Sequence, residues 1–440
     1  MHQKNENGTF TSKIGFVLAA VGSAVGMGNI WMFPYRTGQY GGAAFLIPYL
    51  LFIALFGYVG LSGEFAFGRM TGTGPIGSYE FAMKSRGKKG GAILGTIPLL
   101  GSLGIAIGYA IIVGWVLRSA FGALTGSLMS TEPEQFFTEM SSTNFSSVPW
   151  HTLVILLTAA VLIFGVSGGI EKINKVMMPA FFILFIIIAV RVAFLPNAIE
   201  GYKYLLVPQW EYLLNPRTWI MAMGQAFFSL SITGSGMIIY GSYLSKKEDI
   251  PRAAMQTALL DTCAALLAGF AILPAVFAFG MDPASGPPLI FITLPKVFAQ
   301  MPGGRFIAVL FFLSVIFAGI TSLINMFEVC AEAVTTHLKL PRKAAVVLVG
   351  ALAFAAGAFI EFEPYLGKWM DAITIYVVPF GALLCAFIIY WVLGGKRIGE
   401  ELVLGRKKAL CRAFLPTARY LYVGLAVLVF ILSIICGGIG

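Results

Sequence analysis

The sequence predicts an all-α membrane protein that crosses the bilayer many times, and three observations support this. Of the 440 residues, 58% are hydrophobic and only 11% are charged, whereas a soluble domain carries about 25% charged residues. The mean hydropathy is +0.85 over the whole chain. Apolar runs recur from end to end, and a membrane span needs about 20 such residues. These features exclude a soluble enzyme, a disordered chain and a protein with one membrane anchor.

Eleven apolar runs account for the predicted transmembrane helices. Their bounds, good to about four residues, are 14–36, 43–67, 92–124, 150–166, 176–195, 218–243, 253–280, 306–333, 344–361, 370–394 and 417–437. The proline-rich segment 282–304 between the seventh and eighth runs is too interrupted to span, and it predicts a re-entrant or capping loop. The predicted units are a polar segment 1–13, helices 1 to 5 in 14–200, helices 6 to 10 in 201–395, and a loop with helix 11 in 396–440.

The basic residues predict the orientation of the chain. With the N-terminus in the cytoplasm, 22 of the 30 Lys and Arg residues fall on the cytoplasmic side, which the positive-inside rule favours. Eleven spans then place the C-terminus outside. The net charge of +10 therefore indicates contact with the lipid bilayer and not with nucleic acid. The five cysteines lack metal-type spacing, and the sequence does not indicate an oligomeric state.

Two of the runs are interrupted near their middles by small residues. Run one contains GSAVGMGN, from Gly22 to Asn29, and run six contains SITGSG, from Ser231 to Gly236. Single glycine clusters in membrane helices more often serve close packing. Here the two interruptions lie five spans apart, so the second unit is upside down relative to the first. Paired interruptions in two inverted units instead indicate the central site of a secondary transporter.

The interruptions predict a site for a cation and an anionic group. Unwound backbone cannot be satisfied by hydrocarbon, its carbonyls suit a hard cation, and half-helix N-termini suit a carboxylate. The polar side chains near the breaks are all oxygen donors: Asn29, Ser229, Ser231, Asp261, Thr321 and Ser322. None is a His or Cys, which argues against a transition metal. Na⁺ beside a zwitterionic or carboxylate substrate fits both features.

Several intramembrane residues allow a structural and a functional interpretation. Asp261 is costly inside a span and normally faces a partner or a water-filled path, although a buried acid bonded to Ser or Gln is the alternative. Glu64 lies either at the interface or against the orphan N–H groups of a broken helix. Thr321 and Ser322 bind an ion or are satisfied by carbonyls of their own helix.

Gly169 and Pro179 lie ten residues apart at the start of span five. Glycine weakens a helix and proline removes a backbone donor, so this turn is a candidate cytoplasmic gate that admits water by unwinding. The alternative is an ordinary helix start with proline in its first turn.

Long motifs carry a resemblance to a known family. The runs are AVGSAVGMGNIWMFPYRTGQYGGAAFLIPY, GEFAFGRMTG, GQAFFSLSITGSGMIIYGSYLSKKEDIPRA and FAGITS. They resemble the neurotransmitter:sodium symporter (LeuT-type) family in order over nearly the whole chain, and most of all its bacterial members that carry several hydrophobic amino acids. The resemblance implies a 5+5 inverted repeat with broken helices 1 and 6, a bacterial inner membrane, and symport of an amino acid with two Na⁺ ions.

The resemblance also implies particular site residues. The first sodium site falls on the Ala24 carbonyl, the side chains of Asn29, Ser229 and Asp261, and the substrate carboxylate. The second falls on the carbonyls of Gly22, Val25 and Ala318 with the hydroxyls of Thr321 and Ser322. The substrate carboxylate meets Gly28 and Tyr109, and its amino group the carbonyls of Ala24, Phe228 and Ser231, with Ser229 and Ser322 bordering the same pocket. Phe228 is the lid, and the side-chain pocket is lined by Met27, Ile105, Gly234 and Met326.

Two departures from the family pattern concern the gate and the pocket. Met32 stands where the family usually has Arg, so we expect Arg36, one turn further out, to pair with Asp371. Gly234 stands where several relatives have an aromatic residue, which predicts an enlarged pocket and bulky apolar substrates, aromatic amino acids included.

A third departure concerns chloride. Asp261 stands where many relatives have Asn, and chloride-dependent relatives hold the anion near Tyr49, Gln225 and Ser229. The carboxylate supplies that negative charge here, so the resemblance predicts chloride-independent transport. Whether Asp261 also releases a proton during the cycle is left open by the sequence.

Other function classes are less favoured. A sodium-coupled transporter of another amine or osmolyte is the main alternative. A channel needs a continuous polar stripe, whereas the polar residues here gather at mid-depth. An intramembrane enzyme is disfavoured because His2, His151 and His337 are not placed mid-span beside Ser or Asp, and neither HExxH nor GxSxG occurs.

Overall fold

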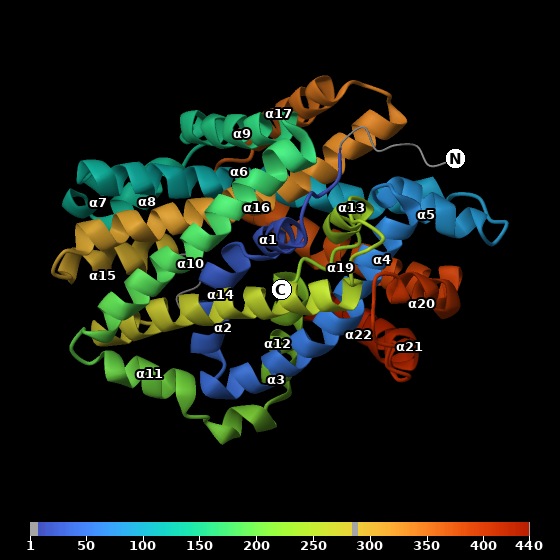
Figure 1. The fold of residues 1–440 in the computed structure, drawn as a ribbon. Coiled ribbons are helices and arrows are strands. Elements are labelled where there is room, and N and C mark those ends of the chain that lie inside the picture. The colour runs from blue at the N-terminus through green and yellow to red at the C-terminus, as the bar shows by residue number, and fades with distance from the viewer. Residues whose placement is uncertain (1–7, 284–288, 440) are drawn as a thin grey trace.

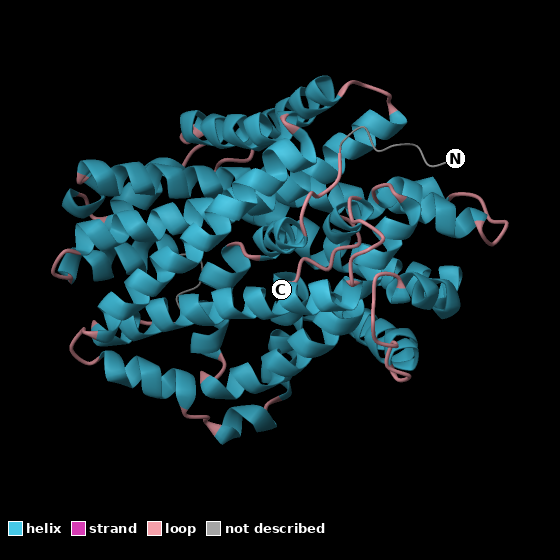
Figure 2. Cartoon of the chain, in the orientation of Figure 1, coloured by secondary structure: helices cyan, strands magenta, loops and turns pink. Residues whose placement is uncertain are grey.

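The computed structural model describes residues 8–283 and 289–439. Over these residues the chain forms helices and loops without a strand (Figure 2). A helical fold satisfies most backbone polar groups within each span, as a bilayer requires.

The first half of the chain is a series of thirteen elements in the described residues. They are α1 (Lys13–Ala24), η1 (Gly28–Met32), α2 (Phe33–Gln39), α3 (Ala43–Leu55), η2 (Phe56–Leu61), α4 (Ser62–Thr71), α5 (Pro75–Lys84), α6 (Gly91–Thr125), α7 (Ser127–Ser130), α8 (Pro133–Ser141), α9 (Val148–Ile163), η3 (Val166–Ile170) and α10 (Glu171–Ala193).

The second half continues in the same way. Its elements are α11 (Ala198–Leu206), η4 (Trp210–Leu214), α12 (Pro216–Ser229), α13 (Gly236–Ser242), α14 (Ile250–Ala278), η5 (Leu289–Thr293), α15 (Leu294–Gln300), α16 (Gly304–His337), α17 (Arg342–Ala358), α18 (Glu363–Asp371), η6 (Ala372–Val377), α19 (Val378–Phe387), η7 (Ile388–Gly394), α20 (Gly395–Val403), α21 (Phe414–Pro416), η8 (Thr417–Tyr422) and α22 (Val423–Cys436).

The eleven predicted apolar runs all fall on helices. Among the described residues, seven continuous helices are long and apolar enough to cross a membrane, and α1 with η1 and α2 forms a bent span. Runs four and nine are the shorter α9 and α17, and run six is divided between α12 and α13. The multi-span prediction is therefore confirmed.

Both predicted helix breaks are present. The first span bends by 59° between Lys13–Ala24 and Gly28–Gln39. The second break separates α12 from α13, and within it Ser231 has φ 51° and Gly234 has φ +75°. Left-handed backbone at these two residues turns the chain out of the helix.

The two breaks lie in the centre of the bundle. α1 packs against α10, α14 and α16, and α6 runs along α16. Figure 1 shows α7, α8 and α15 at one end of the bundle and α5, α20 and α21 at the opposite end. We call these the α8 end and the α20 end. Each half of a broken helix thus has one terminus inside the bundle.

Span five begins earlier than the apolar run indicates. Its helix starts at Val166, and the polar turn that follows is packed into the protein. The reason is Glu171, which is 1% exposed and accepts hydrogen bonds from the Thr11 and Ser12 hydroxyls at 2.8 Å each. The backbone is helical from Gly169 through Pro179, so the unwound turn is absent here and the gate remains a prediction.

The proline-rich segment does not span. Residues 284–288 of it lie outside the described residues, and the remainder forms η5 and α15, which pack against α8 and α16. Leu289 and Phe291 of this segment are buried. The segment thus covers the α8 end of the bundle, as predicted for a capping loop.

Candidate binding site at the two helix breaks

A cavity of about 360 Å³ lies beside both breaks and extends toward Arg36 and Asp371. Ten of the eleven predicted substrate residues line it: Ala24, Met27, Gly28, Ile105, Tyr109, Phe228, Ser229, Ser231, Ser322 and Met326. Its volume suits a ligand of amino-acid size, since small-molecule pockets span about 300–1,000 Å³.

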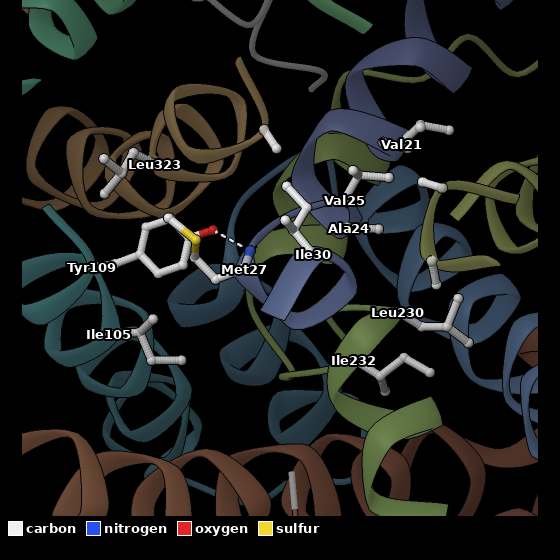
Figure 3. Close-up of a cluster of buried hydrophobic side chains, with 14 of the residues drawn as sticks. Val21, Ala24, Val25, Met27, Ile30, Ile105, Tyr109, Leu230, Ile232 and Leu323 are labelled. Carbon is white, nitrogen blue, oxygen red and sulfur yellow. Dashed lines mark hydrogen bonds between the residues drawn. The ribbon is translucent and has the colours of Figure 1, made fainter. Parts of the chain in front are cut away.

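Tyr109 of α6 anchors the first break. The Met27 N–H donates to the Tyr109 hydroxyl at 2.8 Å, and Figure 3 shows this bond running from the broken helix to α6, with Ile105 one turn away. Accepting this bond leaves the hydroxyl hydrogen free to donate to an anionic group in the cavity. The predicted role of Tyr109 toward a carboxylate is therefore geometrically sound.

Gly26 makes the approach of Tyr109 possible. A Cβ at this position would lie 2.5 Å from the Tyr109 hydroxyl oxygen and 2.9 Å from Ser322 Oγ. Any side chain there would separate the broken helix from α6 and α16. Gly26 was not among the predicted site residues, although it lies within the GSAVGMGN run.

The side chains of the first predicted ion site converge. Ser229 Oγ donates to Asp261 Oδ2 at 2.7 Å, and Asn29 Nδ2 donates to Asp261 Oδ1 at 2.8 Å. Asp261 is fully buried and takes part in none of the ion pairs of the described residues. A buried carboxylate without a cationic side chain, next to the Ser229 hydroxyl and the Asn29 amide, fits a hard cation such as Na⁺.

The backbone oxygens of the second predicted ion site also converge. Ser322 Oγ donates to the carbonyls of Val25 at 3.0 Å and Gly22 at 3.2 Å, and Thr321 Oγ1 donates to the Ala318 carbonyl at 3.1 Å. The Ser322 bonds cross from α16 to the first break, so a local helix bond does not explain this residue. The Thr321 hydroxyl, in contrast, donates to carbonyls of its own helix, Phe317 and Ala318, which is the structural interpretation of this residue given above.

The apolar part of the cavity comes from four helices. Met27, Ile105, Phe228 and Met326 contribute to its lining. Phe228 lies over the first break, since a Cβ on Gly28 would meet its ring at 3.5 Å. These side chains provide a wide apolar region next to the polar one.

Gly234, which we predicted to line the side-chain pocket, is not among the residues that line the cavity in this structure. Its N–H donates to Glu64 Oε1 at 2.8 Å, and a Cβ on it would lie 2.8 Å from both the Tyr79 hydroxyl and the Gly381 carbonyl. The residue is a left-handed turn that faces α5 and α19. Thr233 lines the cavity in its place.

The same bond decides between the two interpretations of Glu64. Glu64 is 1% exposed and accepts an N–H from the unwound segment of the second break. It therefore braces the broken helix and is not an interfacial residue. Of the two interpretations that the sequence left open, the structure shows the one in which Glu64 satisfies an orphan donor of the broken helix.

Arg36 and Asp371 both line the outer part of the cavity, toward the α8 end. No ion pair joins these two described residues, and Arg36 Nη1 lies 2.8 Å from Met221 Sδ instead. The predicted gate pair is thus not formed in this structure, whose cavity extends between the two side chains.

Gly437 and Gly438 form a part of the cavity wall that the sequence did not indicate. Both have positive φ, 66° and 108°, which turns the chain back after α22. Ile439 is then 2% exposed and sits against Gly224 of α12. Two glycines after an apolar helix resemble an ordinary helix end, so nothing in the sequence marked them.

On the α20 side of the breaks a polar cluster joins α9, α16, α17 and the end of α13. Glu328 accepts from the Tyr243 hydroxyl at 2.6 Å and pairs with Arg342, whose Nη2 lies 2.6 Å from Oε2. Arg342 also donates to the Leu162 carbonyl at 2.8 Å. This cluster ties α16 and α17 to the end of the second broken helix.

Comparisons with known proteins agree with this geometry. The chain matches the sequence model of the sodium:neurotransmitter symporter family over residues 7–148 and 134–436. It is 35% identical to the uncharacterized sodium-dependent transporter YhdH of Bacillus subtilis, over 97% of each chain. It is 26% identical to the sodium-dependent serotonin transporter of Drosophila melanogaster, over 91% of this chain and 72% of that one.

A solved structure matches the fold closely. The crystal structure of MhsT in complex with L-phenylalanine superposes with a TM-score of 0.87 at 32% identity, covering 97% of this chain and 99% of that one.

Proposed function

Because the chain belongs to the sodium:neurotransmitter symporter family, and is thus a sodium-dependent multi-pass membrane transporter of LeuT-type fold and not an enzyme, we propose that it imports hydrophobic and aromatic L-amino acids with two Na⁺ ions. The predicted family and fold class are confirmed by the matches above. The substrate and the number of ions are the proposal.

The observation that carries the proposal is the composition of the cavity. One side presents Tyr109 and the first break, which suit a carboxylate, and the other side presents Met27, Ile105 and Met326. A free amino acid with a bulky apolar side chain matches both. MhsT, whose structure contains L-phenylalanine, supports the same choice.

The proposed mechanism couples the ions to the substrate through the broken helices. A cation between Asp261, Asn29 and Ser229 fixes α14 to both breaks, and a second between Val25 and Ser322 fixes the first break to α16. The substrate carboxylate completes the first site. Binding of all three ligands then favours closure over the cavity by Phe228 and opening at the other end, since ligands shift the equilibrium only by their different affinities for the two states.

The proposed orientation follows the basic residues. The α20 end carries the Lys- and Arg-rich segments and is placed in the cytoplasm of a bacterial cell, with the N-terminus. The C-terminus and the α8 end then face outward, and the cavity is reached from outside past Arg36 and Asp371.

Uptake into proteoliposomes tests the proposed function. We expect labelled tryptophan and leucine to accumulate under an inward Na⁺ gradient and not under an equal K⁺ gradient. Unlabelled bulky apolar amino acids should compete, and glycine and alanine should compete poorly. Sodium-driven uptake of an amine or osmolyte in preference to these amino acids would refute the proposal.

A double-mutant cycle tests the gate. If Arg36 and Asp371 meet when the cavity closes, Arg36→Ala and Asp371→Ala should each lower uptake, and their combined effect should be smaller than the sum by about 1 kcal/mol. Arg217, exposed at the start of α12, provides the control, since Arg217→Ala combined with Asp371→Ala should be additive. Unchanged uptake by Asp371→Ala would contradict the pairing.

A further inference from the structure

A second cavity, separate from the proposed substrate site, lies at the α20 end. Its volume is about 600 Å³, and six cationic side chains line it: Lys13, Lys247, Arg252, Arg406, Lys407 and Lys408. The lining contains two acidic residues, Glu248 and Asp249. Asp249 is already engaged, since its Oδ1 lies 3.3 Å from Arg406 Nη1 and accepts the Arg252 N–H at 3.2 Å. The cavity therefore carries an excess of positive charge.

The two loops that carry most of these cations are held rigidly together. Gly405 has φ +74°, and a Cβ on it would lie 2.5 Å from the Lys247 carbonyl, so only glycine permits this approach. The buried Arg69 of α4 lies behind them. Its Nη1 donates to the Glu248 carbonyl at 2.7 Å, and its Nε pairs with Glu401 at 2.6 Å. The positive charges are thus arranged around a fixed concave surface and not on independent loops.

The wall of this cavity on the bundle side is apolar and continues down the outside of the bundle. Tyr58 of η2 and Met255 of α14 line the cavity, and η2 packs directly against α14. One turn beyond Met255 along α14, Leu259 is 63% exposed. On α3, which precedes η2, Leu51 is 54% exposed. Exposed apolar side chains on transmembrane helices face the lipid chains, so the cavity adjoins apolar, lipid-facing surface of α3 and α14, which we call the α3–α14 track.

We propose that this cavity binds the headgroup of an anionic phospholipid, with its acyl chains along the α3–α14 track. A phosphate surrounded by lysine and arginine at the membrane surface, next to an apolar surface that faces the lipid chains, is the arrangement that such lipids require. Free phosphate shares the headgroup chemistry but makes no use of the track. The site connects to transport because the Lys247 loop joins the second half of the broken helix, α13, to α14.

The test uses the purified full chain in detergent with added lipid. Dioleoyl-phosphatidylglycerol should raise the thermal unfolding midpoint saturably, while dioleoyl-phosphatidylcholine, glycerol 3-phosphate and inorganic phosphate should not. In Lys247→Gln/Lys407→Gln/Lys408→Gln the half-saturating lipid concentration should rise about tenfold or more, because each basic residue near an anionic surface contributes a factor of about five.

The matched control removes the same charge elsewhere at the same end. Lys84, Lys88 and Lys89 are exposed and do not line the cavity, so their triple Gln variant should respond as the unmodified protein does. The pair Met255→Ser/Leu259→Ser should weaken the lipid effect while keeping all the cations, which separates a lipid from a bare phosphate.

Three results would overturn the proposal. They are an equal midpoint shift with phosphatidylcholine, an equal shift with inorganic phosphate, or an unchanged lipid response of the cavity triple variant that folds as judged by gel filtration. The experiment measures binding without transport, so its outcome does not depend on which amino acid the protein carries.

Discussion

The variant Asp261→Asn is expected to need chloride for uptake, whereas the unmodified protein is expected to work equally well in chloride and in gluconate. Asn has the size of Asp and still bonds to Ser229 and Asn29, but it removes the one negative charge that the structure buries at the first ion site. The Tyr49 hydroxyl lies near Asp261, Ser229 and Thr262, and the side-chain oxygen of Gln225 has no hydrogen-bond partner among the described residues. An anion that approaches the Tyr49 hydroxyl would restore the missing charge.

The size of the effect follows from the lost charge. A hydrogen bond or ion contact to a charged group contributes about 1.5–3 kcal/mol, so the half-saturating Na⁺ concentration in gluconate should rise roughly tenfold to a hundredfold. Chloride should reverse most of that rise.

Initial uptake rates over a range of Na⁺ concentrations, in chloride and in gluconate, measure both effects. Glu200→Gln, on the exposed side of α11, removes the same charge far from the site and should leave both curves unchanged. Wild-type sodium dependence of Asp261→Asn in gluconate would show that the carboxylate does not hold the ion. A large loss of uptake by the unmodified protein in gluconate would contradict chloride independence.

Gly26→Ala is expected to abolish most uptake although it adds a single methyl group. The new carbon would lie 2.5 Å from the Tyr109 oxygen, closer than the two atoms can approach, so Tyr109 or the first break must move. The bond from the Met27 N–H to Tyr109 is then lost or lengthened. An unsatisfied buried N–H costs about 1–3 kcal/mol, which corresponds to about a fivefold to hundredfold increase in KM.

The matched control is Gly424→Ala on α22. A Cβ there meets nothing within 4 Å, so this variant should transport normally. Tyr109→Phe provides a second measurement, because it removes the oxygen and with it part of the clash. Gly26→Ala combined with Tyr109→Phe should therefore be less impaired than the sum of the two single effects. Normal uptake by Gly26→Ala would contradict the proposed role of Tyr109.

Much of the fold could be predicted because each membrane span can be recognised from its own residues. A segment that crosses hydrocarbon must be apolar over about 20 residues whatever its neighbours are, so the eleven runs were visible without any contact information. The start of span five was predicted too late, because its polar first turn is recognisable as part of the helix only from contacts with distant residues. Glu171 and the polar turn around it look like a loop in isolation, and only their burial against Thr11 and Ser12 makes them part of the helix.

The oxygen donors of the proposed ion sites could be predicted because they lie next to visible interruptions of the helices. Asn29, Ser229 and Asp261 converge as the resemblance implied, and Ser322 reaches the first break. Gly234 faces Glu64 and Tyr79 in this structure and not the cavity, because a residue's place in a motif does not give the direction in which an unwound segment turns. That direction is set by a positive φ and by the bond to Glu64.

The sequence by itself determined the class of the protein, its spans, its two broken helices and the chemistry of its central oxygen donors, because hydropathy and helix interruption are local properties. The tertiary structure decided what depends on contacts between distant segments. It placed Gly26 against Tyr109 and Gly437 in the cavity wall, and it joined the loops of Lys247 and Gly405 into a second, basic cavity. Contacts of this kind are set by how helices pack, and packing is not encoded in any single stretch of the chain.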